Sequence, residues 1–326
     1  MFVGLMFKFY KMKKLLTLFL GLTILSCSSE DQESEKANSL KGTSESVLDG
    51  KVLSFQSEES FVREYSYLAT LNKDELQKWI SSKGVVSLLN TTDNSLGIEE
   101  DVISESRVVY SAALESILNA ESKLKIAGKV LWLNERSFYL LSENETILSV
   151  KELIERKSEL EKFGELLSIS GASKSLTGRM VLPNENRVKT FASAEMNVSG
   201  SRLRHVVDLY NETILLNGSI LTSEMFLRST LQYRSCSTLG GCKWKEAFNP
   251  RYLRSNFIGG DAVGVWTVGN IYTSSTVTGT QTYHVGHWTF KTPTHSNSNF
   301  VISGPITCSL DIPFPTPEVS VDISWY

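Results

Sequence analysis

The chain has 326 residues, of which 41% are hydrophobic, and this length is enough for two ordinary domains. Its 33 Lys and Arg against 36 Asp and Glu give a net charge of -3 at pH 7. Four of those lysines and no acid lie in residues 1–26, so a chain that begins at residue 27 carries a net charge of -7. With that charge and no run of basic residues, the chain is not expected to bind nucleic acid.

The first predicted element is a secretory signal. Lys13 and Lys14 precede an apolar run over 15–25, which is too short to span a bilayer as a permanent anchor. Cys27 follows the small residue Ser26. This arrangement resembles the lipobox of bacterial lipoproteins, in which the cysteine is acylated and becomes the first residue. We therefore predict a signal peptide over 1–26, a lipid on Cys27, and a membrane partner that the chain does not cross.

The polar stretch after Cys27 argues against the alternative of an uncleaved or buried apolar helix. Residues 28–35 contain no apolar side chain, and their Ser-Ser-Glu-Asp start resembles the signal that sends Bacteroidetes lipoproteins to the cell surface. Residues 27–50 are too poor in hydrophobic side chains to fold alone and are expected to form a flexible tether. The expected location is the outer membrane, with the folded part lipid-anchored and facing the cell surface.

Residues 51–168 predict a small α+β module that begins with a strand and two helices. The segment 51–55 alternates weakly, as a strand does. Ser57, followed by two glutamates, is expected to cap the first helix. Asn72 with Glu75 predicts the start of a second helix, and Gly84 its end.

The rest of this module contains segments with helical spacing and segments with the alternation of a strand. A third helix is expected over 104–118. Strands over 124–132 and 137–141 are expected to pair across Asn134-Glu135. Apolar side chains at helical spacing over 150–167 then predict the longest helix of the module.

Residues 169–200 are rich in small polar side chains and are expected to be a linker. From 201 to 326 short alternating segments dominate, such as 227–234 and 282–290, and the cleanest is 319–325. Such segments, separated by Gly, Asn and Ser, favour an antiparallel β-sandwich. The predicted fold class is therefore α+β, with a small helix-plus-hairpin N-terminal module followed by an antiparallel β-sandwich.

With the lipid on Cys27, three cysteines remain, which allows one disulfide at most. Cys236 and Cys242 are separated by Ser-Thr-Leu-Gly-Gly and can close a small loop at the end of a hairpin. Pairing of either one with Cys308 is the alternative, and the spacing does not decide between them. No Cys or His spacing typical of a metal site is present, and neither a metal nor a cofactor is expected.

The histidines offer a weak candidate for metal binding. His284 and His287 are three residues apart, so on a regular strand they point to opposite faces and cannot hold one ion without a bulge. His205 and His295 are isolated in the sequence and are expected on loops or on exposed strand faces.

Catalytic residues are no better supported. There is no Gly-x-Ser-x-Gly motif, and the serines at 199 and 201 fall in the predicted linker. Cys242 has no sequence cue for a neighbouring base. A glycosidase needs two carboxylates facing each other across a cleft, and acids are not unusually frequent in the β-region, where they include Glu246, Asp261, Asp311 and Asp322. No catalytic residue is assigned.

Aromatic side chains are the more suggestive group. Trp266, Trp288 and Trp325 lie in alternating apolar segments and are expected in the core. Trp244 between two lysines, and Tyr326 at the end, are expected to be exposed. Exposed aromatic rings provide flat platforms for sugars or partner proteins.

The N-terminal module resembles a family of uncharacterised Bacteroidetes lipoproteins with a domain of unknown function. The resemblance covers about residues 51–145, and it carries no known catalytic residue. Its pattern is a strand ending in Phe, an acidic helix, and a Trp helix ending in Ser-x-x-Gly. The chain departs from it at Ala127-Gly128, where the family tends to have Gly-Asp, so a different turn is expected there. The matching residues are Phe55, Glu58-Glu59-Ser60-Phe61, Trp79, Ser81, Gly84, Ser87-Leu88, Ile117-Leu118-Asn119 and 123–130.

The sequence thus predicts a lipid-anchored envelope protein whose folded part binds a glycan or a protein partner without catalysis. An exported hydrolase acting on polysaccharide or peptide is the first alternative, and a structural envelope component is the second. An aromatic strip on the surface would favour binding. Two facing carboxylates in a cleft, or a Ser or Cys in contact with a His, would favour the hydrolase.

Overall fold

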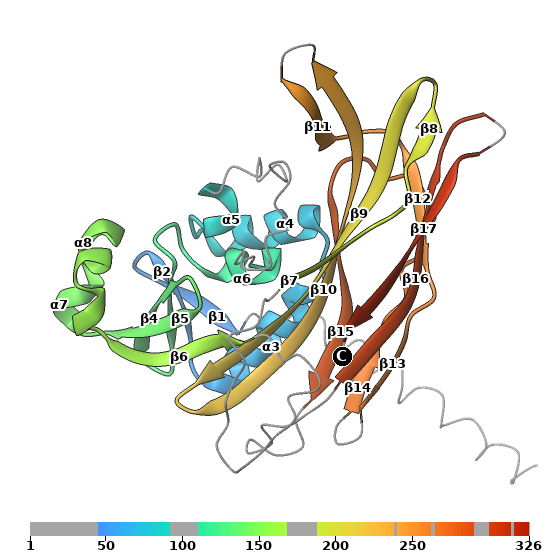
Figure 1. The fold of residues 1–326 in the computed structure, drawn as a ribbon. Helices are drawn as coiled ribbons and strands as arrows, with labels where there is room; N and C mark the ends of the chain where they lie inside the picture. The colour runs from blue at the N-terminus through green and yellow to red at the C-terminus, as the bar shows by residue number, and fades with distance from the viewer. Residues whose placement is uncertain are drawn as a thin grey trace, which may run out of the picture. The chain divides into compact units, whose positions relative to one another are not determined.

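Two long neighbouring strands, β9 (Ser201–Leu216) and β10 (Ser219–Ser237), run through the centre of the fold (Figure 1). Asn217 and Gly218 join them with positive φ at both residues, as a two-residue hairpin turn requires. The structure is a computed structural model, and it describes residues 45–91, 110–167, 188–237, 240–261, 265–289, 300–313 and 316–325. Most of these residues are in strands, and the helices are few and short.

Thirteen of the described strands form one sheet, in which β9 and β10 are central. Its main path is β1-β2-β3-β4-β5-β6-β9-β10-β15-β14, while β7 and β8 also pair with β9 and β11 pairs with β10. Only β2 and β3 run parallel among these pairs. The bounds are β1 (Ser46–Asp49), β2 (Val52–Phe55), β3 (Lys123–Ile126), β4 (Lys129–Asn134), β5 (Ser137–Leu141), β6 (Glu161–Leu167), β7 (Val188–Ala192), β8 (Met196–Val198), β11 (Gly241–Glu246), β14 (Val265–Val268) and β15 (Gln281–Thr289).

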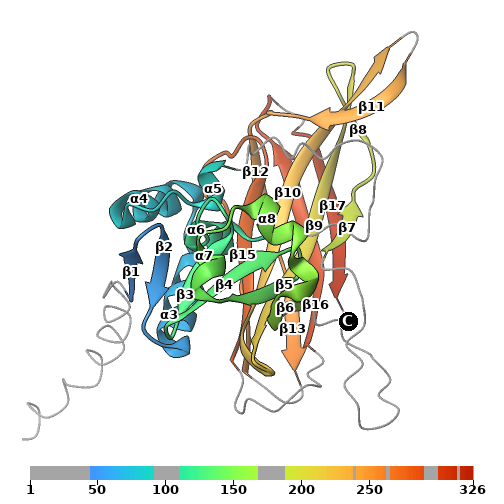
Figure 2. The same cartoon turned by 90° about the vertical axis from the view of Figure 1, so that its left-hand side faces the viewer.

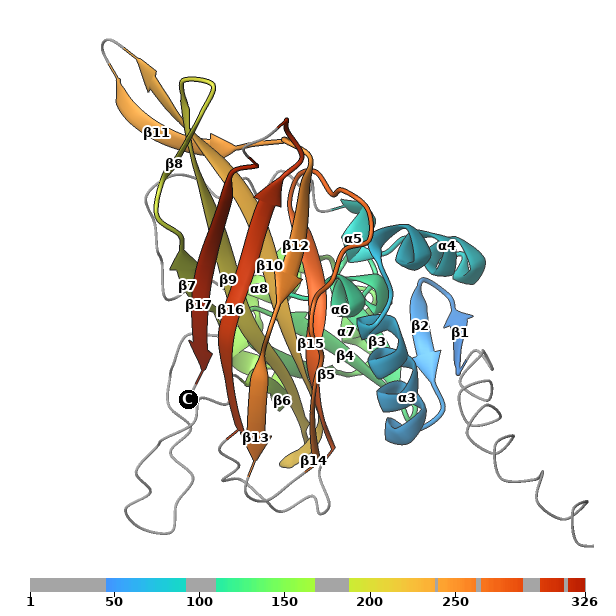
Figure 3. The same ribbon diagram turned by 90° about the vertical axis from the view of Figure 1, so that its right-hand side faces the viewer.

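A second sheet of four described strands faces β9 and β10. Among the described strands, β16 pairs with β12 and β13 on one side and with β17 on the other, which leaves β17 at the edge of this sheet. The side chains of β17 alternate as predicted, and Val321, Ile323 and Trp325 are buried. Figure 3 shows this sheet lying across the face of β9 and β10 that is turned away from the helices. The bounds are β12 (Arg251–Ser255), β13 (Ile258–Asp261), β16 (Phe300–Leu310) and β17 (Glu318–Trp325).

The helices lie on the opposite face of β9 and β10, as Figure 2 shows. Ser57 caps α3 and Asn72 caps α4 through reciprocal capping boxes, and Gly84 ends α4 in the left-handed conformation. These three sequence predictions are confirmed. The bounds are α3 (Glu58–Ala69), α4 (Lys73–Lys83), α5 (Leu88–Thr91), α6 (Ala112–Ile117), α7 (Glu143–Thr146), α8 (Val150–Glu155) and the 3-10 helix η1 (Lys157–Glu159).

Alternation along the central strands supplies two hydrophobic cores at once. Tyr210 and Ile214 of β9 belong to the core shared with α3, α4 and α6. Val207 and Leu209 point the other way and join the core between the two sheets. Both sets are buried, so β9 reads as an almost continuous buried strand, as expected of a strand covered on both faces.

The helix predicted over 150–167 is wrong beyond its first two turns. Only Val150–Glu155 is α-helical, and Glu161–Leu167 is the strand β6, paired with β5 on one side and β9 on the other. Ile154, expected on the buried face, is exposed. The apolar spacing fits both periods over so short a run, and strand pairing on both sides of β6 decides the outcome.

Other boundaries differ in the same way. The helix predicted over 104–118 is Ala112–Ile117, and residues 104–109 lie outside the described part. The hairpin across Asn134-Glu135 is confirmed, and Ala127-Gly128 forms the β3–β4 turn with positive φ at both residues. Residues 188–198, placed in the predicted linker, form β7 and β8 against β9.

The β6–β9 pairing joins the parts on either side of the expected linker. Gly164 and Leu216 are partners in this ladder, and residues 45–326 form one compact unit. The expected domain division at 169–200 therefore does not interrupt the large sheet.

Gly164 is expected to be intolerant of a side chain. A Cβ there would overlap the carbonyl oxygen of Leu215 and approach Leu216 Cδ2 to 2.5 Å. Gly164→Ala should therefore lower the free energy of unfolding by about 2 kcal/mol or more, measured by urea denaturation. Gly269→Ala is the control, because its Cβ would meet nothing nearer than 3.9 Å. Equal stability of the two variants would contradict the tight approach of β6 to β9.

Candidate functional site

Two buried glutamates face each other across the central strands. Glu212 of β9 and Glu224 of β10 are cross-strand partners, so their side chains project from the same face of the sheet. This is the face that α3 and α6 cover, since Tyr210 and Phe226 beside them belong to the helix-side core. Neither glutamate has any exposed surface. A pair of carboxylates at this depth needs hydrogen-bond donors or cations around it.

Glu224 is held by both histidines of β15. His284 Nε2 lies 2.7 Å from Glu224 Oε2, and His287 Nδ1 lies 2.8 Å from Glu224 Oε1. The strand can present both rings to one carboxylate because the register shifts there: Phe226 pairs with His284, and Met225 with Gly286. Val285 is the extra residue of this bulge and points into the opposite core.

The expectation that these two histidines point to opposite faces is therefore wrong. The prediction allowed a bulge as the exception, and the structure contains one at Val285. The rings act as hydrogen-bond donors to Glu224. Within the described residues no group of three or more His, Cys, Asp or Glu side chains is arranged to hold a metal ion.

The helices supply further donors to the glutamates, beside Thr222 of β10, which donates to Glu224 Oε1 at 3.1 Å. Ser66 of α3 donates to Glu224 Oε1 at 2.8 Å. Tyr65, on the same helix, donates its hydroxyl to Glu212. Ser111, which caps α6, donates its backbone N–H to Glu212 Oε2 at 2.8 Å and its hydroxyl to Glu212 Oε1 at 2.5 Å. The two carboxylates thereby connect α3 and α6 to the strands.

Electrostatics differ between the members of this cluster. Burial raises the pKa of Glu224, but hydrogen bonds from His284 and His287 outweigh it and leave the pKa below its ordinary value. The bond to Glu224 raises the pKa of His287 despite partial burial. Burial, followed by the charges of Glu212 and Glu224, raises the pKa of Tyr65 well above its ordinary value. The Tyr65 hydroxyl therefore stays a donor at every physiological pH.

Glu115 of α6 is a further acid that interacts electrostatically with Glu212. Burial, with the charge of Glu212 second, raises its pKa to about 7, and Arg228 offsets part of this rise. Arg228 itself pairs with the buried Asp208 at 2.5 Å.

The arrangement is suited to holding the helices on the sheet. Every oxygen of Glu212 and Glu224 accepts at least one hydrogen bond from the protein, and both side chains are fully buried. A general acid or base must reach its substrate directly or through one water. We therefore infer that this cluster has a structural role. Its four central residues, Glu212, Glu224, His284 and His287, are called the latch below.

A second His contact lies inside the core between the sheets. His205 Nε2 is 2.7 Å from Ser229 Oγ, and both residues are buried. Burial, with the charge of Arg251 second, lowers the pKa of His205 to about 3. His205 Nδ1 has no hydrogen-bond partner among the described residues, and none of their carboxylates orients the ring as a catalytic pair requires. The prediction of a surface position for His205 is wrong, because β9 is covered on both faces.

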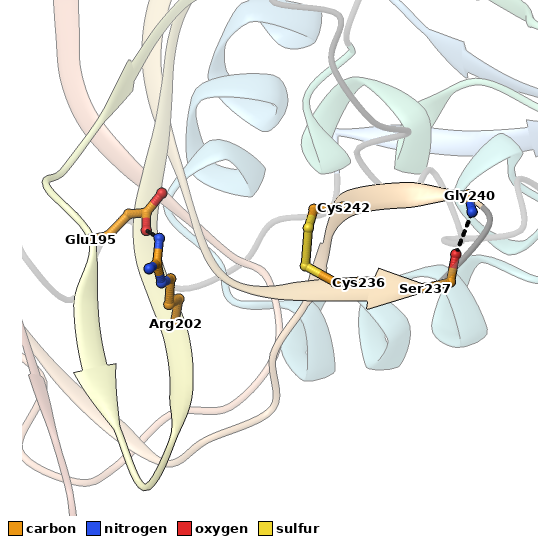
Figure 4. Close-up of a disulfide and its surroundings, with 6 residues drawn as sticks. All are labelled: Glu195, Arg202, Cys236, Ser237, Gly240 and Cys242. Carbon is orange, nitrogen blue, oxygen red and sulfur yellow. Dashed lines mark hydrogen bonds and ion pairs between the residues drawn. A yellow bond between two sulfur atoms is a disulfide. The ribbon is translucent and has the colours of Figure 1, made fainter.

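The cysteines follow one of the two predicted arrangements. Cys236 and Cys242 are joined by a disulfide at the far end of the β10–β11 ribbon (Figure 4), and Cys308 is free and buried. Burial raises the pKa of Cys308 to about 11, so it is not a ready nucleophile. Cys27, His295 and Tyr326 lie outside the described residues, as do the side chains of Trp266 and Trp288.

Trp244 lies on a projecting surface that we call the basic arm. The arm consists of the described residues 232–237 and 240–246 of the β10–β11 ribbon, together with residues 195–204 of the β8–β9 hairpin. In Figures 1 and 3 both hairpins extend beyond the helices at the same end of β9 and β10. Trp244 is half-buried, and the guanidinium of Arg204 lies over its ring, 4.2 Å from the centroid. Arg204 Nε in turn donates to Gln232 Oε1 at 2.9 Å.

The latch was missed by sequence reasoning because its histidines lie on β15, about sixty residues after Glu224, and meet the two glutamates of the β9–β10 hairpin only through strand pairing. The available signal was two polar triplets, Asn211-Glu212-Thr213 and Thr222-Ser223-Glu224, each flanked by apolar residues in its strand. All six of these residues are buried.

Comparisons with known proteins add little. No protein-family model matches the chain, and no curated protein matches it. Among solved structures, a DUF4848 family protein from Bacteroides thetaiotaomicron is similar over 83% of this chain and 94% of its own, at 11% identity and a TM-score of 0.21. A likeness this loose supports no inference about fold or function. In the described part, no helix is long and apolar enough to cross a membrane.

Glu115 gives a prediction for pH dependence. Because its folded pKa lies near 7, above the ordinary 4.5, its contribution to stability is full below pH 4.5 and is lost as the pH rises through 7. Glu115→Gln should therefore raise the free energy of unfolding at pH 8.5 by about 1–3 kcal/mol and change it much less at pH 5. Chemical denaturation at both values measures this. The exposed Glu155→Gln is the control, and a gain that does not depend on pH would contradict the prediction.

The latch gives a second prediction with its own pH window. Glu224 contributes stability that is lost as the pH falls below the ordinary carboxyl value of 4.5, and His287 contributes stability that is lost as the pH rises above 6.5. The double variant His284→Gln/His287→Gln should therefore lose about 3 kcal/mol at pH 6, and less at pH 9. Thermal unfolding at the two pH values measures the difference.

The matched test of the latch adds Glu224→Gln to that double variant. Once the buried charge is gone, part of the lost stability should return, as a coupled pair requires. A triple variant less stable than the double variant at pH 6 would show that Glu224 does not depend on the histidines.

Proposed function

We propose that this protein is a lipid-anchored lipoprotein of the bacterial outer membrane whose folded part binds a glycan without catalysis. In this proposal, residues 51–168 form the helix-plus-hairpin module and residues 201–326 the β-sandwich that carries the binding surface. Binding of a protein partner at the same surface is the alternative within this proposal.

The location rests on the N-terminal sequence. A basic start, a short apolar run, Cys27 after a small residue and a polar acidic tether occur together and in order. Acylation of Cys27 would tether the chain to the membrane, and the acidic residues after it favour the cell surface.

Binding rests on the basic arm. Its ribbon extends past the two cores, the disulfide closes its end, and Trp244 is held in place by Arg204. A fixed aromatic ring presents contact area at little cost in conformational entropy, which suits a sugar ring or a partner surface.

The hydrolase alternative has less support in the described residues. The two facing carboxylates, Glu212 and Glu224, are buried and engaged by donors. The Ser229–His205 contact is buried as well and lacks an orienting acid. A purely structural envelope role would leave the shape and charge of the arm without a purpose.

The lipid anchor is tested by metabolic labelling with a palmitate analogue. Wild-type protein should be labelled and recovered with the outer membrane. Cys27→Ala should lose the label, because no other residue follows a signal peptide in this position. Label retained by Cys27→Ala, or wild-type protein recovered among soluble cytosolic enzymes, would refute the anchor.

Glycan binding is tested on a glycan array with the purified mature chain. Trp244→Ala should weaken binding about tenfold or more, because it removes the aromatic platform and the surface on which Arg204 stacks. Tyr272→Ala is the control, since Tyr272 is exposed but lies off the arm. Wild-type binding that Trp244→Ala leaves unchanged would remove the arm from the proposal.

A further inference from the structure

The basic arm brings together cations that are scattered in the sequence. Residues 195–204 and 232–246 contain five basic residues against two acids, Glu195 and Glu246, while the chain from residue 27 onward carries a net charge of -7. The sequence showed no basic cluster because two of the five precede Arg234, the next of them, by about thirty residues. The basic residues are Arg202, Arg204, Arg234, Lys243 and Lys245.

The register of β10 and β11 sorts these cations onto both faces of the ribbon. Tyr233 pairs with Lys245, and Ser235 with Lys243, so one face carries an aromatic ring and two exposed lysines. Residues two apart on a strand are separated by about 7 Å, which places the two lysine side chains within reach of adjacent charges on an extended ligand.

The other face repeats the arrangement. Arg234 pairs with Trp244, and Arg204 of β9 lies over the Trp244 ring. Each face of the ribbon therefore combines one aromatic side chain with two cations, and the face of Trp244 also carries Glu246, the partner of Gln232. Of the two acids, Glu195 pairs with Arg202 at 3.3 Å, and Glu246 accepts from Thr280 at 2.9 Å. The Glu195–Arg202 pair is drawn in Figure 4.

We propose that the basic arm binds an anionic polysaccharide, with sugar rings against Tyr233 or Trp244 and carboxylates or sulfates beside the cations. This inference rests on the proposed function and names the ligand class of the same surface. Arginine matches carboxylate and sulfate geometry with paired donors, and lysine acts as a point charge. The chain from residue 27 onward has a net negative charge, which repels an anionic ligand away from the arm. The contact with the ligand should therefore stay confined to the arm.

A polysaccharide fits this surface better than a membrane does. Between Cys236 and Cys242 the sequence has one large apolar residue, Leu239, which lies outside the described residues, whereas interfacial membrane binding needs an apolar face to insert. A two-stranded ribbon with cations on two faces suits an extended chain with regularly repeated charge.

The test measures binding of the full mature chain to polygalacturonate, to chondroitin sulfate and to neutral dextran, at low and high salt, by affinity electrophoresis. Wild-type protein should bind at least one of the two anionic polymers and not dextran, and the affinity should fall with salt. Lys243→Glu/Lys245→Glu should weaken binding about tenfold or more. The milder Lys243→Ala/Lys245→Ala should weaken it less, which guards against misfolding of the charge-reversed ribbon.

The matched control is Lys73→Glu/Lys78→Glu, which makes the same change of net charge at two exposed lysines of α4. Equal weakening by both charge-reversed variants would overturn the inference, because net charge and not the arm would then govern binding. If the protein binds dextran, and this binding is lost in Trp244→Ala but kept in the Lys243/Lys245 variants, the inference of an anionic ligand is overturned. The proposed function would still stand. Absence of binding to every glycan would overturn both, and binding only to vesicles containing anionic lipid would overturn the polysaccharide in favour of a membrane.

Discussion

The fold depends on how two carboxylates are accommodated between a sheet and its covering helices. Glu212 and Glu224 are partners on adjacent strands, so their charges lie close together in a place that water does not reach. Such a pair is costly unless each oxygen receives a donor. Besides Thr222 of β10 itself, donors come from α3, from the start of α6 and from the bulged strand β15, and they therefore join three separate stretches of the chain to the central strands.

This constraint explains features that otherwise look unrelated. The bulge at Val285 allows His284 and His287 to share one face, and without it one ring would point into the opposite core. Ser111 both begins α6 and donates to Glu212, so the helix start is fixed by a tertiary contact as well as by its local cap. Buried polar networks of this kind favour one arrangement of the parts over others when all members are satisfied.

The central strands contribute both to the packed cores and to a projecting surface. Over most of their length β9 and β10 are covered on both faces, by the helices and by the second sheet. Beyond Gln232 the residues of β10 become exposed or half-buried, and this strand continues into the ribbon of the basic arm. Long strands can therefore build both the core and an exposed ribbon, and the disulfide between Cys236 and Cys242 restrains that ribbon where packing no longer does.

Local signals in the sequence determined much of this protein. The caps at Ser57 and Asn72, the end of α4 at Gly84, the hairpin at Asn134-Glu135 and the alternation of β17 all follow from neighbouring residues. The change from helix to strand at 161–167, the bulge that unites two histidines, and the burial of His205 did not, because each depends on strands that pair from a distance. The basic arm is the same case, since charges from 202–204, 234 and 243–245 meet only once β8, β9, β10 and β11 are aligned. Local sequence determines the structure within about one helical turn or one strand period of a residue. Only the tertiary structure decides which residues from distant parts of the chain become neighbours, because strand pairing sets those contacts.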